Sequence, residues 1–384
     1  MRYNGAMKRG RQNLDYVANR RGRRLDATGA GPYIKLGSAV LTLAAVIALL
    51  LFVVIPLAAE GFTDFSRREK RPAGEESENP AATVLPALMT NRIQTYTLNP
   101  KKGEAVMADA AILDDRLVYA TGEAETALTR IVSVYLNTGR RQVIEPELEN
   151  DCLRMPRLND EYIVWFDAKA GGGGNICVRN AATGGDAVLV RLNEGLPVLQ
   201  LSGRYLVFTA NTGLAVKLYA ADLSDFSVVT LALFSGEAYA ASRPDLADGR
   251  VYYAAEQGLR ICDLATGEQF SVETGGYAHD PRAAGDGVLW LTADHGEDTD
   301  LRYRAADGSV FRIAGGVIDA GAANNCIAYN RDGTVYAYSF ITGSTWMLSG
   351  AEEYAQLVAA GGDYVLWRVL KSGEAAAYRY LRVN

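Results

Sequence analysis

Residues 250–268 read RVYYAAEQGLRICDLATGE, and this stretch decides the fold. It consists of an apolar run, a short turn, a second apolar run and then Thr266-Gly267. Short runs rich in β-branched and aromatic residues, separated by turn residues, are typical of antiparallel strands. A glycine closes such a turn because tight connections between two strands need a residue that accepts positive φ. The stretch therefore predicts a β-hairpin.

The same hairpin pattern occurs seven times from about residue 91 to the end of the chain. The first runs are spaced 37 to 46 residues apart, with centres at Val118, Val164, Val207, Tyr252, Leu289, Ile327 and Leu366. A second run follows each of the first six and ends in a turn, as in NICVRNAATG (175–184) and VYAYSFITG (335–343). A period of this length indicates a repeat architecture.

Two further short segments flank each hairpin, for example RPDLADG (243–249) before it and EQFSVET (268–274) after it. Four antiparallel strands in about 40 residues are typical of a propeller blade. The first runs are also apolar on both faces, as expected for a blade packed between two others. We therefore predict an all-β fold, a β-propeller of seven four-stranded blades. Six or eight blades remain alternatives, because LNPKKGEAV (98–106) also resembles the turn of a repeat copy.

The last copy of the repeat stops one strand short, after its third strand. The segment RIQTYTL (92–98) precedes the first complete copy and has no partner strands of its own. We predict that it supplies the outer strand of the last blade. Joining the two ends of the domain in this way would leave no large unpaired sheet edge.

Two of these repeats carry a family resemblance. The units at 250–268 and 162–185 resemble those of TolB-like and WD40-like bacterial propellers, in which a strand after Asp-Gly precedes a Tyr-x-x-Asp-x-x-Thr-Gly strand and turn. The chain lacks the Gly-His and Trp-Asp pairs of strict WD40 repeats. The resemblance implies a binding or scaffolding platform that holds partners in its central channel or on its loop faces.

A different kind of segment precedes the repeats. Residues 36–59 contain no charged side chain, and 24 helical residues are enough to cross the hydrocarbon core of a bilayer. We predict one transmembrane helix here; a cleaved signal peptide is the alternative, but 35 residues precede the run and no clean cleavage site follows it. Nine Lys or Arg and two Asp in residues 1–35 predict that this tail stays in the cytoplasm.

The remaining segments complete the predicted organisation. Residues 60–90 are rich in Pro, Glu, Ser and Ala and are expected to form a flexible linker. Residues 91–384 then form an extracytoplasmic propeller of a single-pass cell-membrane protein. Beyond the tail, 30 basic and 43 acidic residues remain, and this balance argues against nucleic acid as a partner. The basic tail needs no role beyond topology, although a lipid or partner contact is an alternative.

Candidate ligand-binding residues lie in one acidic loop and at one histidine. The loop ADHGEDTD (293–300) brings together Asp294, His295, Glu297, Asp298 and Asp300. Clustered oxygen ligands suit calcium, but the spacing lacks the pattern of a specific calcium loop, so we expect a solvated loop and no metal. The other candidate, His279, sits just before a predicted inner strand, from which it could face the channel.

The sequence gives little support for catalysis. The stretch 339–346 is similar to a sialidase Asp-box but has Ile341 in the aspartate position, and such boxes are structural turns. GGGG (171–174) lacks the Lys-Ser/Thr of a phosphate loop. The cysteines show no metal spacing, and we expect buried free thiols, with a bond between different blades left open. We predict no catalytic residue and no cofactor.

The predicted function is therefore non-enzymatic. We expect a membrane-anchored platform, held by residues 36–59, that binds a protein, a peptide or a cell-envelope glycan outside the cytoplasm. One alternative is an envelope hydrolase or lyase that processes glycan or peptide in the channel. The other is a single-pass sensor that couples outside binding to the cytoplasmic tail, for which 35 residues leave little room for a folded output domain.

Overall fold

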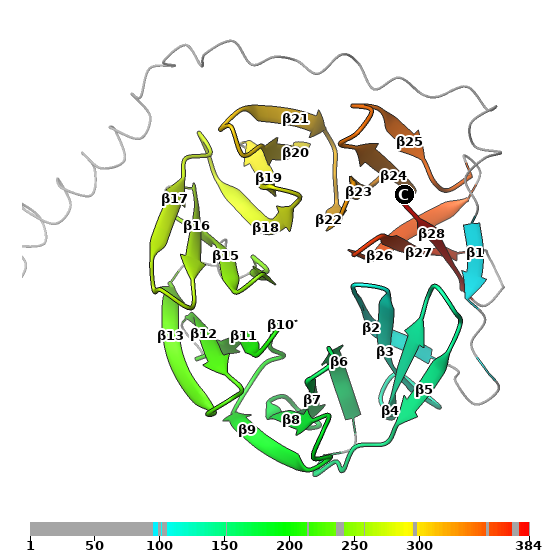
Figure 1. Cartoon of the computed structure of the whole chain (residues 1–384), viewed down its shortest axis with the longest axis vertical. Coiled ribbons are helices and arrows are strands. Elements are labelled where there is room, and N and C mark those ends of the chain that lie inside the picture. Colours follow the sequence, from blue (N-terminus) through cyan, green and yellow to red (C-terminus); the bar gives the residue numbers. More distant parts are fainter. Residues whose placement is uncertain are drawn as a thin grey trace, which may run out of the picture. The chain divides into compact units, whose positions relative to one another are not determined.

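The repeats form a ring of seven four-stranded antiparallel sheets around a common axis (Figure 1). The computed structural model describes residues 95–98, 101, 106–150, 152–212, 215–235, 242–256, 258–294, 298–350, 353–370 and 376–383. These residues confirm the predicted all-β propeller and its blade number, and they exclude six or eight blades.

The first four blades follow the chain order of their strands. Blade 1 contains β2 (Val106–Leu113), β3 (Arg116–Gly122), β4 (Leu128–Tyr135) and β5 (Arg141–Ile144). Blade 2 contains β6 (Cys152–Leu158), β7 (Tyr162–Ala168), β8 (Gly174–Asn180) and β9 (Asp186–Leu192). Blade 3 contains β10 (Leu199–Ser202), β11 (Tyr205–Asn211), β12 (Val216–Asp222) and β13 (Ser227–Phe234). Blade 4 contains β14 (Asp245–Ala247), β15 (Arg250–Ala255), β16 (Gly258–Asp263) and β17 (Gln269–Val272).

The last three blades include the one that joins the two ends of the propeller. Blade 5 contains β18 (Ala278–Ala284), β19 (Gly287–Asp294), β20 (Asp298–Arg304) and β21 (Val310–Ala314). Blade 6 contains β22 (Asp319–Ala323), β23 (Cys326–Arg331), β24 (Thr334–Ser339) and β25 (Thr345–Met347). Blade 7 contains β26 (Tyr354–Gly361), β27 (Tyr364–Leu370), β28 (Ala377–Arg382) and β1 (Thr95–Leu98).

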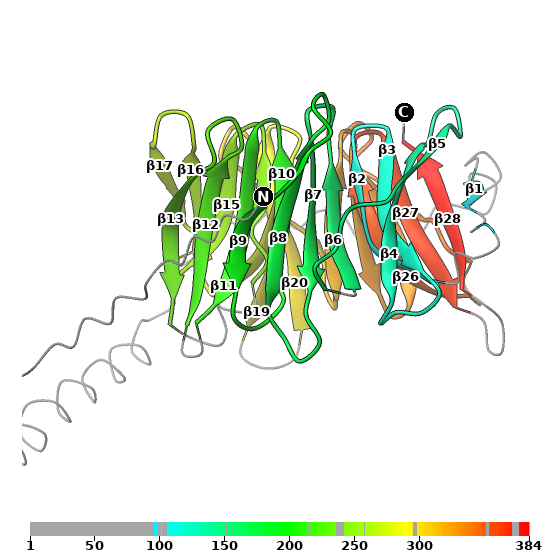
Figure 2. The ribbon, with the colours of Figure 1, turned by 90° about the horizontal axis from the view of Figure 1, so that it is seen from below.

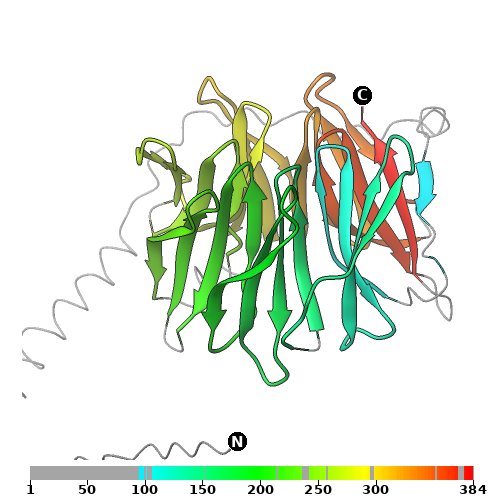
Figure 3. The same cartoon turned by 60° about the horizontal axis from the view of Figure 1, so that its bottom comes forward.

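The Thr-Gly turns of the repeat have a shared construction. After β16, the N–H of Gly267 donates to the carbonyl of Asp263, and φ of this glycine is 75°. The side chain of Asp263 also accepts bonds from the N–H groups of Ala265 and Thr266. Ser339 and Gly343 build the same turn after β24, so the stretch that is similar to an Asp-box is a structural turn here. Such turns gather at the ends of the strands (Figure 3).

The hydrophobic core consists of seven clusters, one between each pair of neighbouring blades. The strands of neighbouring blades run side by side around the ring (Figure 2). Tyr252 packs in the cluster shared with blade 5 and Tyr253 in the one shared with blade 3, which confirms that the second strand is buried on both faces. Trp165, Trp290 and Trp367 occupy equivalent second strands and are each 0% exposed. Packing between blades therefore provides the main driving force for folding.

The ring is closed by pairing of its two ends, as the sequence predicts. The strand β1 pairs antiparallel with β28, so that Tyr96 lies opposite Tyr380 (Figure 1). The two tyrosine rings stack with their centroids 5.1 Å apart. This pairing covers the edge that β28 would otherwise expose.

We expect Tyr96→Ala to lower the free energy of unfolding by about 1 kcal/mol, because a stacked aromatic pair contributes roughly this amount beyond its buried area. Urea titration followed by circular dichroism measures the change. The control is Phe270→Ala on the outer strand β17, since Phe270 is 51% exposed and Tyr96 is 40% exposed. An equal loss in both variants would show that the closing strand has no special role.

The cysteines are free thiols. Cys177, Cys262 and Cys326 are buried, and Cys152 is partly buried. Burial raises the pKa of Cys177 and of Cys326 to about 12, so these thiols are protonated and unreactive near neutral pH. The prediction of free thiols is confirmed, and only the burial of Cys152 is less complete than expected.

The predicted tail, transmembrane helix and linker, at 1–35, 36–59 and 60–90, lie outside the described residues. Among the residues that are described, no helix has the length and apolar character needed to cross a membrane.

Candidate functional site

A central cavity is the feature that all seven blades build together. In each blade one strand lies nearest to the axis (Figure 1). These seven inner strands are β2, β6, β10, β14, β18, β22 and β26. Side chains from these seven inner strands line a cavity of about 310 Å³. Seventeen of the 23 lining residues are apolar, and none of these described residues is aromatic. The charged lining residues are Arg157, Arg243, Arg282, Asp245 and Asp319.

Four of the inner strands, β2, β6, β18 and β26, are interrupted by a bulge or a similar register shift. In the first three of these, Asp109, Met155 and Asp280 have φ values of 52°, 50° and 49°. Residues other than glycine rarely adopt this left-handed conformation, which costs about 1 kcal/mol or more. Each bulge bends its strand and breaks the alternation of side chains between the two faces. Side chains after the bulge consequently point in directions that simple alternation does not predict.

The bulge in β2 joins blade 1 to blade 2. Asp109 accepts hydrogen bonds from Arg154 Nε at 2.5 Å and from the N–H of Met155 at 3.1 Å. Burial alone would raise the pKa of Asp109, but the bonds from Arg154 and Met155 outweigh it and hold this pKa below its usual range. The carboxylate is therefore ionised and acts as a bridge between blades.

The bulge in β18 belongs to a larger bridge across three blades. Arg243, just before β14, donates from Nη2 to Asp280 of blade 5 at 2.9 Å and to Asp319 of blade 6 at 2.7 Å. The N–H of Arg243 also donates to Asp280 at 2.6 Å. Burial alone would raise the pKa of Asp280, but His279 and Arg243 hold it well below its usual range. The backbone N–H, Nε and Nη2 of this arginine are thus engaged by carboxylates of the protein itself.

Two other arginines in the channel are held differently. Arg157 and Arg282 each follow a proline that comes after a bulge residue, in Met155-Pro156-Arg157 and Asp280-Pro281-Arg282. Arg157 donates from Nη1 to the carbonyl of Pro156 at 2.9 Å and to that of Asp109 at 3.5 Å. Arg282 donates from Nη1 to the carbonyls of Pro281 at 2.9 Å and Arg243 at 3.0 Å.

Neither of these two guanidinium groups has a carboxylate partner among the described residues. Burial lowers the pKa of Arg157 to about 10; Asp109 and Asp245 act against this change, and the like charge of Arg282 adds to it. Arg157 thus remains protonated at neutral pH. Asp245 uses its carboxylate to accept a bond from the N–H of Ala283 at 2.9 Å.

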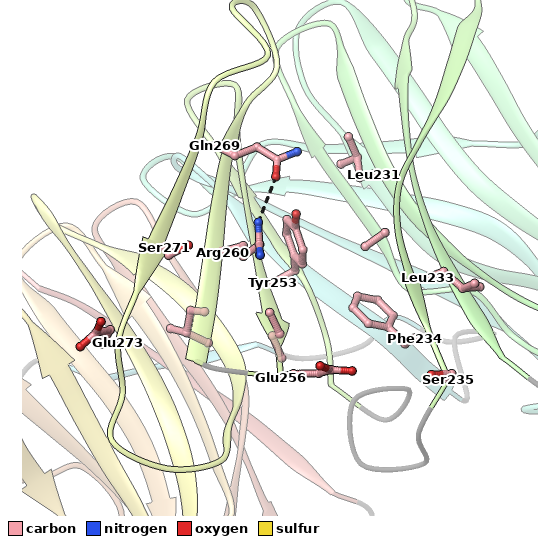
Figure 4. Close-up of a pocket in the computed structure, with 14 residues that line it drawn as sticks. Leu231, Leu233, Phe234, Ser235, Tyr253, Glu256, Arg260, Gln269, Ser271 and Glu273 are labelled. Atoms are coloured by element: carbon pink, nitrogen blue, oxygen red, sulfur yellow. Dashed lines mark hydrogen bonds between the residues drawn. The ribbon is translucent and has the colours of Figure 1, made fainter. Parts of the chain in front are cut away.

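A larger cleft than the channel lies between blades 3 and 4 (Figure 4). It measures about 790 Å³; Leu231 and Phe234 line it from blade 3, and Tyr253 lines it from blade 4. On the blade 4 side of the cleft, Arg260 Nη1 donates a hydrogen bond to Gln269 Oε1 at 3.5 Å. Residues 236–241, which continue the chain from Ser235 at the edge of this cleft, lie outside the described residues.

The predicted acidic loop is shorter than the sequence suggests. Strand β19 extends to Asp294 and β20 begins at Asp298, and these two residues pair directly. Asp300 lies within β20, where it accepts a bond from Arg312 Nη2 at 2.9 Å. Its side chain is 15% exposed, so Asp300 belongs to an ion pair rather than to a solvated loop. His295, Glu297 and the side chains of Asp294 and Asp298 lie outside the described residues, so ligand binding at the loop stays a prediction.

His279 lies within the inner strand β18, whereas the sequence predicts it just before that strand. Its ring stacks on Tyr277 with centroids 5.6 Å apart, and Nδ1 lies 3.8 Å from Asp280. His279 is not among the residues that line the central cavity. Its role as a ligand residue also stays a prediction.

Within the described residues, no group of three or more His, Cys, Asp or Glu side chains is arranged to hold a metal ion. The channel's ionisable groups are arginines and aspartates, which suit ion pairing and the recognition of charged groups. Sequence analysis did not single out Arg157, Arg243 or Arg282. The available signal was the pair of x-Pro-Arg segments, at 155–157 and 280–282, in two of the predicted inner strands.

Fold and channel together define a β-propeller with a closed ring. Comparison with solved structures finds other β-propellers of similar fold. The β-propeller domain of the Trilobed protease from Pyrococcus furiosus is 13% identical, with a TM-score of 0.53 over 73% of this chain and 94% of that one. That domain is described as having an open velcro topology, whereas β1 and β28 close the ring here.

Two other similar structures are enzymes. An oligogalacturonate lyase in complex with manganese is 9% identical, with a TM-score of 0.51 over 76% of this chain and 96% of that one. An acylaminoacyl peptidase is 13% identical, with a TM-score of 0.54; the match covers 73% of this chain and 51% of the peptidase.

TolB from Acinetobacter baumannii is 11% identical, with a TM-score of 0.44, and the match covers 70% of this chain and 63% of TolB. No protein family and no curated protein sequence matches the chain. At these identities the likeness establishes the fold alone.

Proposed function

We propose that the propeller is a non-enzymatic binding platform that receives a segment of a partner polypeptide in its central channel. The observation that carries this proposal is the cavity of about 310 Å³ that all seven inner strands line. Ligand sites commonly combine an apolar lining with a few placed polar groups. The channel has this composition, with 17 apolar residues among the 23 that line it and five charged ones.

The charged groups support binding better than catalysis. General acid–base catalysis needs a group that exchanges its proton near the working pH. The channel arginine Arg157 keeps its proton, because burial lowers its pKa only to about 10. Asp280, which pairs with the lining residue Arg243, has a pKa well below its usual range and stays ionised. These groups therefore supply fixed charges rather than a proton donor.

The lining favours a polypeptide over a glycan. Sugar rings are commonly held by stacking on the faces of aromatic side chains, which offer large rigid contact areas. No described residue of the cavity lining is aromatic. Small apolar side chains with a few charges suit the side chains and terminal groups of a peptide. The partner we propose is accordingly a protein or peptide.

The proposed setting follows from the sequence. Residues 36–59 would anchor the protein as a single-pass helix, with the tail inside and the propeller outside the cytoplasm. The partner would then be a protein of the cell envelope. The acidic balance beyond residue 35 supports a partner other than nucleic acid.

The test is a selection of random 12-residue peptides displayed on phage against the full-length chain in mild detergent. We expect recovered peptides to bind the wild-type chain and to lose at least tenfold in affinity for Gln200→Trp, because Gln200 lines the cavity and the larger ring fills it. The matched control is Gln142→Trp, since Gln142 is exposed on the outer strand β5.

Three results would contradict the proposal. Peptides that bind both variants equally would place binding outside the channel. Retention of oligogalacturonate or chitohexaose in place of any peptide would favour a glycan partner. Cleavage of a bound peptide, detected by mass spectrometry, would support the enzymatic alternative.

A further inference from the structure

We infer that Arg157 and Arg282 form a binding site for an oxyanion group, a carboxylate or a phosphate, of the ligand that enters the channel. The inference rests on the proposed function and names the chemical group that the channel recognises. Both guanidinium groups line the same cavity of about 310 Å³ and come from inner strands of blades 2 and 5.

The charge of these two arginines is not balanced by direct partners. Among the described residues, the hydrogen bonds of the Arg157 and Arg282 side chains go to backbone carbonyls, and no described carboxylate lies within ion-pair distance of either. The Nε of Arg157 is buried and has no hydrogen-bond partner among the described residues. A buried cation without a carboxylate is costly, so a bound anion would be stabilised here.

The arginines of the channel thus divide into two kinds. Arg243 is paired with Asp280 and Asp319, so its charge is balanced within the protein, whereas Arg157 and Arg282 have no such partners among the described residues. Asp245 lies near Arg157 and offsets one of the two unpaired positive charges. The charged lining residues are three arginines and two aspartates, a net charge of +1, and anion binding therefore depends on local geometry rather than on a large net field.

The backbone positions both guanidinium groups in advance. Each arginine follows a proline, whose φ is fixed, and a bulge residue in the left-handed conformation. Nη1 of each arginine is tied to the carbonyl of that proline and to a carbonyl of the neighbouring blade. Such fixed groups lose little conformational freedom when a ligand binds. The planar guanidinium fork matches the paired oxygens of a carboxylate or phosphate.

The test measures binding of two small anions to the full-length chain in mild detergent. Sodium acetate and inorganic phosphate are titrated at constant ionic strength, and the melting temperature is followed by circular dichroism. Anything that binds the folded state raises the melting temperature with its concentration. We expect at least one anion to stabilise the wild-type chain, and Arg157→Gln and Arg282→Gln each to weaken its apparent affinity at least tenfold.

Two further variants keep the result interpretable. Arg191→Gln removes an exposed arginine of β9 that pairs with Glu149, and anion binding should be unchanged. Arg157→Lys keeps the charge but loses the fork, so an intermediate affinity is expected. Stabilisation by acetate identifies a carboxylate ligand, and stabilisation by phosphate alone identifies a phosphorylated one.

The inference is overturned if neither anion stabilises the wild-type chain, or if both glutamine variants respond as the wild type does. This failure is distinct from failure of the proposed function. Peptides that require an open channel but do not depend on Arg157 or Arg282 would leave the binding platform intact without the anion site. Anion binding with no recovered peptide would contradict the binding platform instead.

Discussion

Trp290→Ala is expected to lower the free energy of unfolding by about 4 kcal/mol, the largest effect of any single substitution considered for this propeller. Trp290 is 0% exposed and packs between blades 4 and 5 with Tyr252, Leu259 and Val288. Alanine would leave a cavity in a layer that both blades help to build. Urea titration of the full-length chain, followed by far-ultraviolet circular dichroism, measures the loss.

Trp290→Phe is the matched variant for this experiment. The indole N–H of Trp290 has no hydrogen-bond partner among the described residues, so phenylalanine removes volume without breaking a polar contact. We expect a loss of about 1 to 2 kcal/mol, well below that of alanine. Equal losses in the two variants, or a loss below 1 kcal/mol in Trp290→Ala, would show that packing between blades is not the main source of stability.

The fold could be predicted from the sequence because each blade repeats the same local pattern of apolar strands and turns. Apolar residues on both faces of the second strands, as in Val251, Tyr252 and Tyr253, are needed wherever a sheet is packed between two others. Thr266-Gly267 and its equivalents mark the turns, since Gly267 takes positive φ. Closure could also be inferred, because the missing outer strand and the spare strand at 92–98 are complementary.

The channel site could not be predicted from the same pattern. Alternation along an inner strand assigns each side chain to a face, but a bulge adds a residue and changes the assignment beyond it. Met155, which carries the bulge before Arg157, is a residue that rarely adopts positive φ, whereas Asp280, before Arg282, belongs to a type that does so more often. No common local propensity therefore marks these two positions. The contacts between Arg243, Asp280 and Asp319 also join blades far apart in sequence.

For the acidic stretch at 293–300, the sequence predicts more loop than the structure has. Its composition suggests a loop, because Asp and Gly are rare in strands. In the structure, Thr299 and Asp300 continue the ladder of β20, and Asp300 is paired with Arg312. Opposite charge on the neighbouring strand compensates for the poor strand propensity of an aspartate. Propensity was overridden here by pairing that the local sequence does not reveal.

The second large effect is expected at the bridge between three blades. Arg243→Ala should lower the free energy of unfolding by about 2 kcal/mol at pH 7, because it leaves the carboxylates of Asp280 and Asp319 without their shared cation. Arg243 is 40% exposed, which places the loss below that of a fully buried pair. Urea titrations at several pH values measure it, with Arg191→Ala at an exposed ion pair as the control, for which less than about 1 kcal/mol is expected.

The pH dependence separates charge from packing at this bridge. The pKa of Asp280 in the folded protein lies below its unfolded value near 4, so its ion pair stabilises the protein above that pH and is lost on acidification. Without Arg243 the burial of Asp280 favours its protonated form, and acid then costs the variant less stability than it costs the wild type. The difference in free energy of unfolding between the wild type and Arg243→Ala should consequently be largest at pH 6 to 7 and shrink towards pH 3. A difference that stays constant over this range would assign the role of Arg243 to packing of its side chain, and the three blades would then be held together without help from its charge.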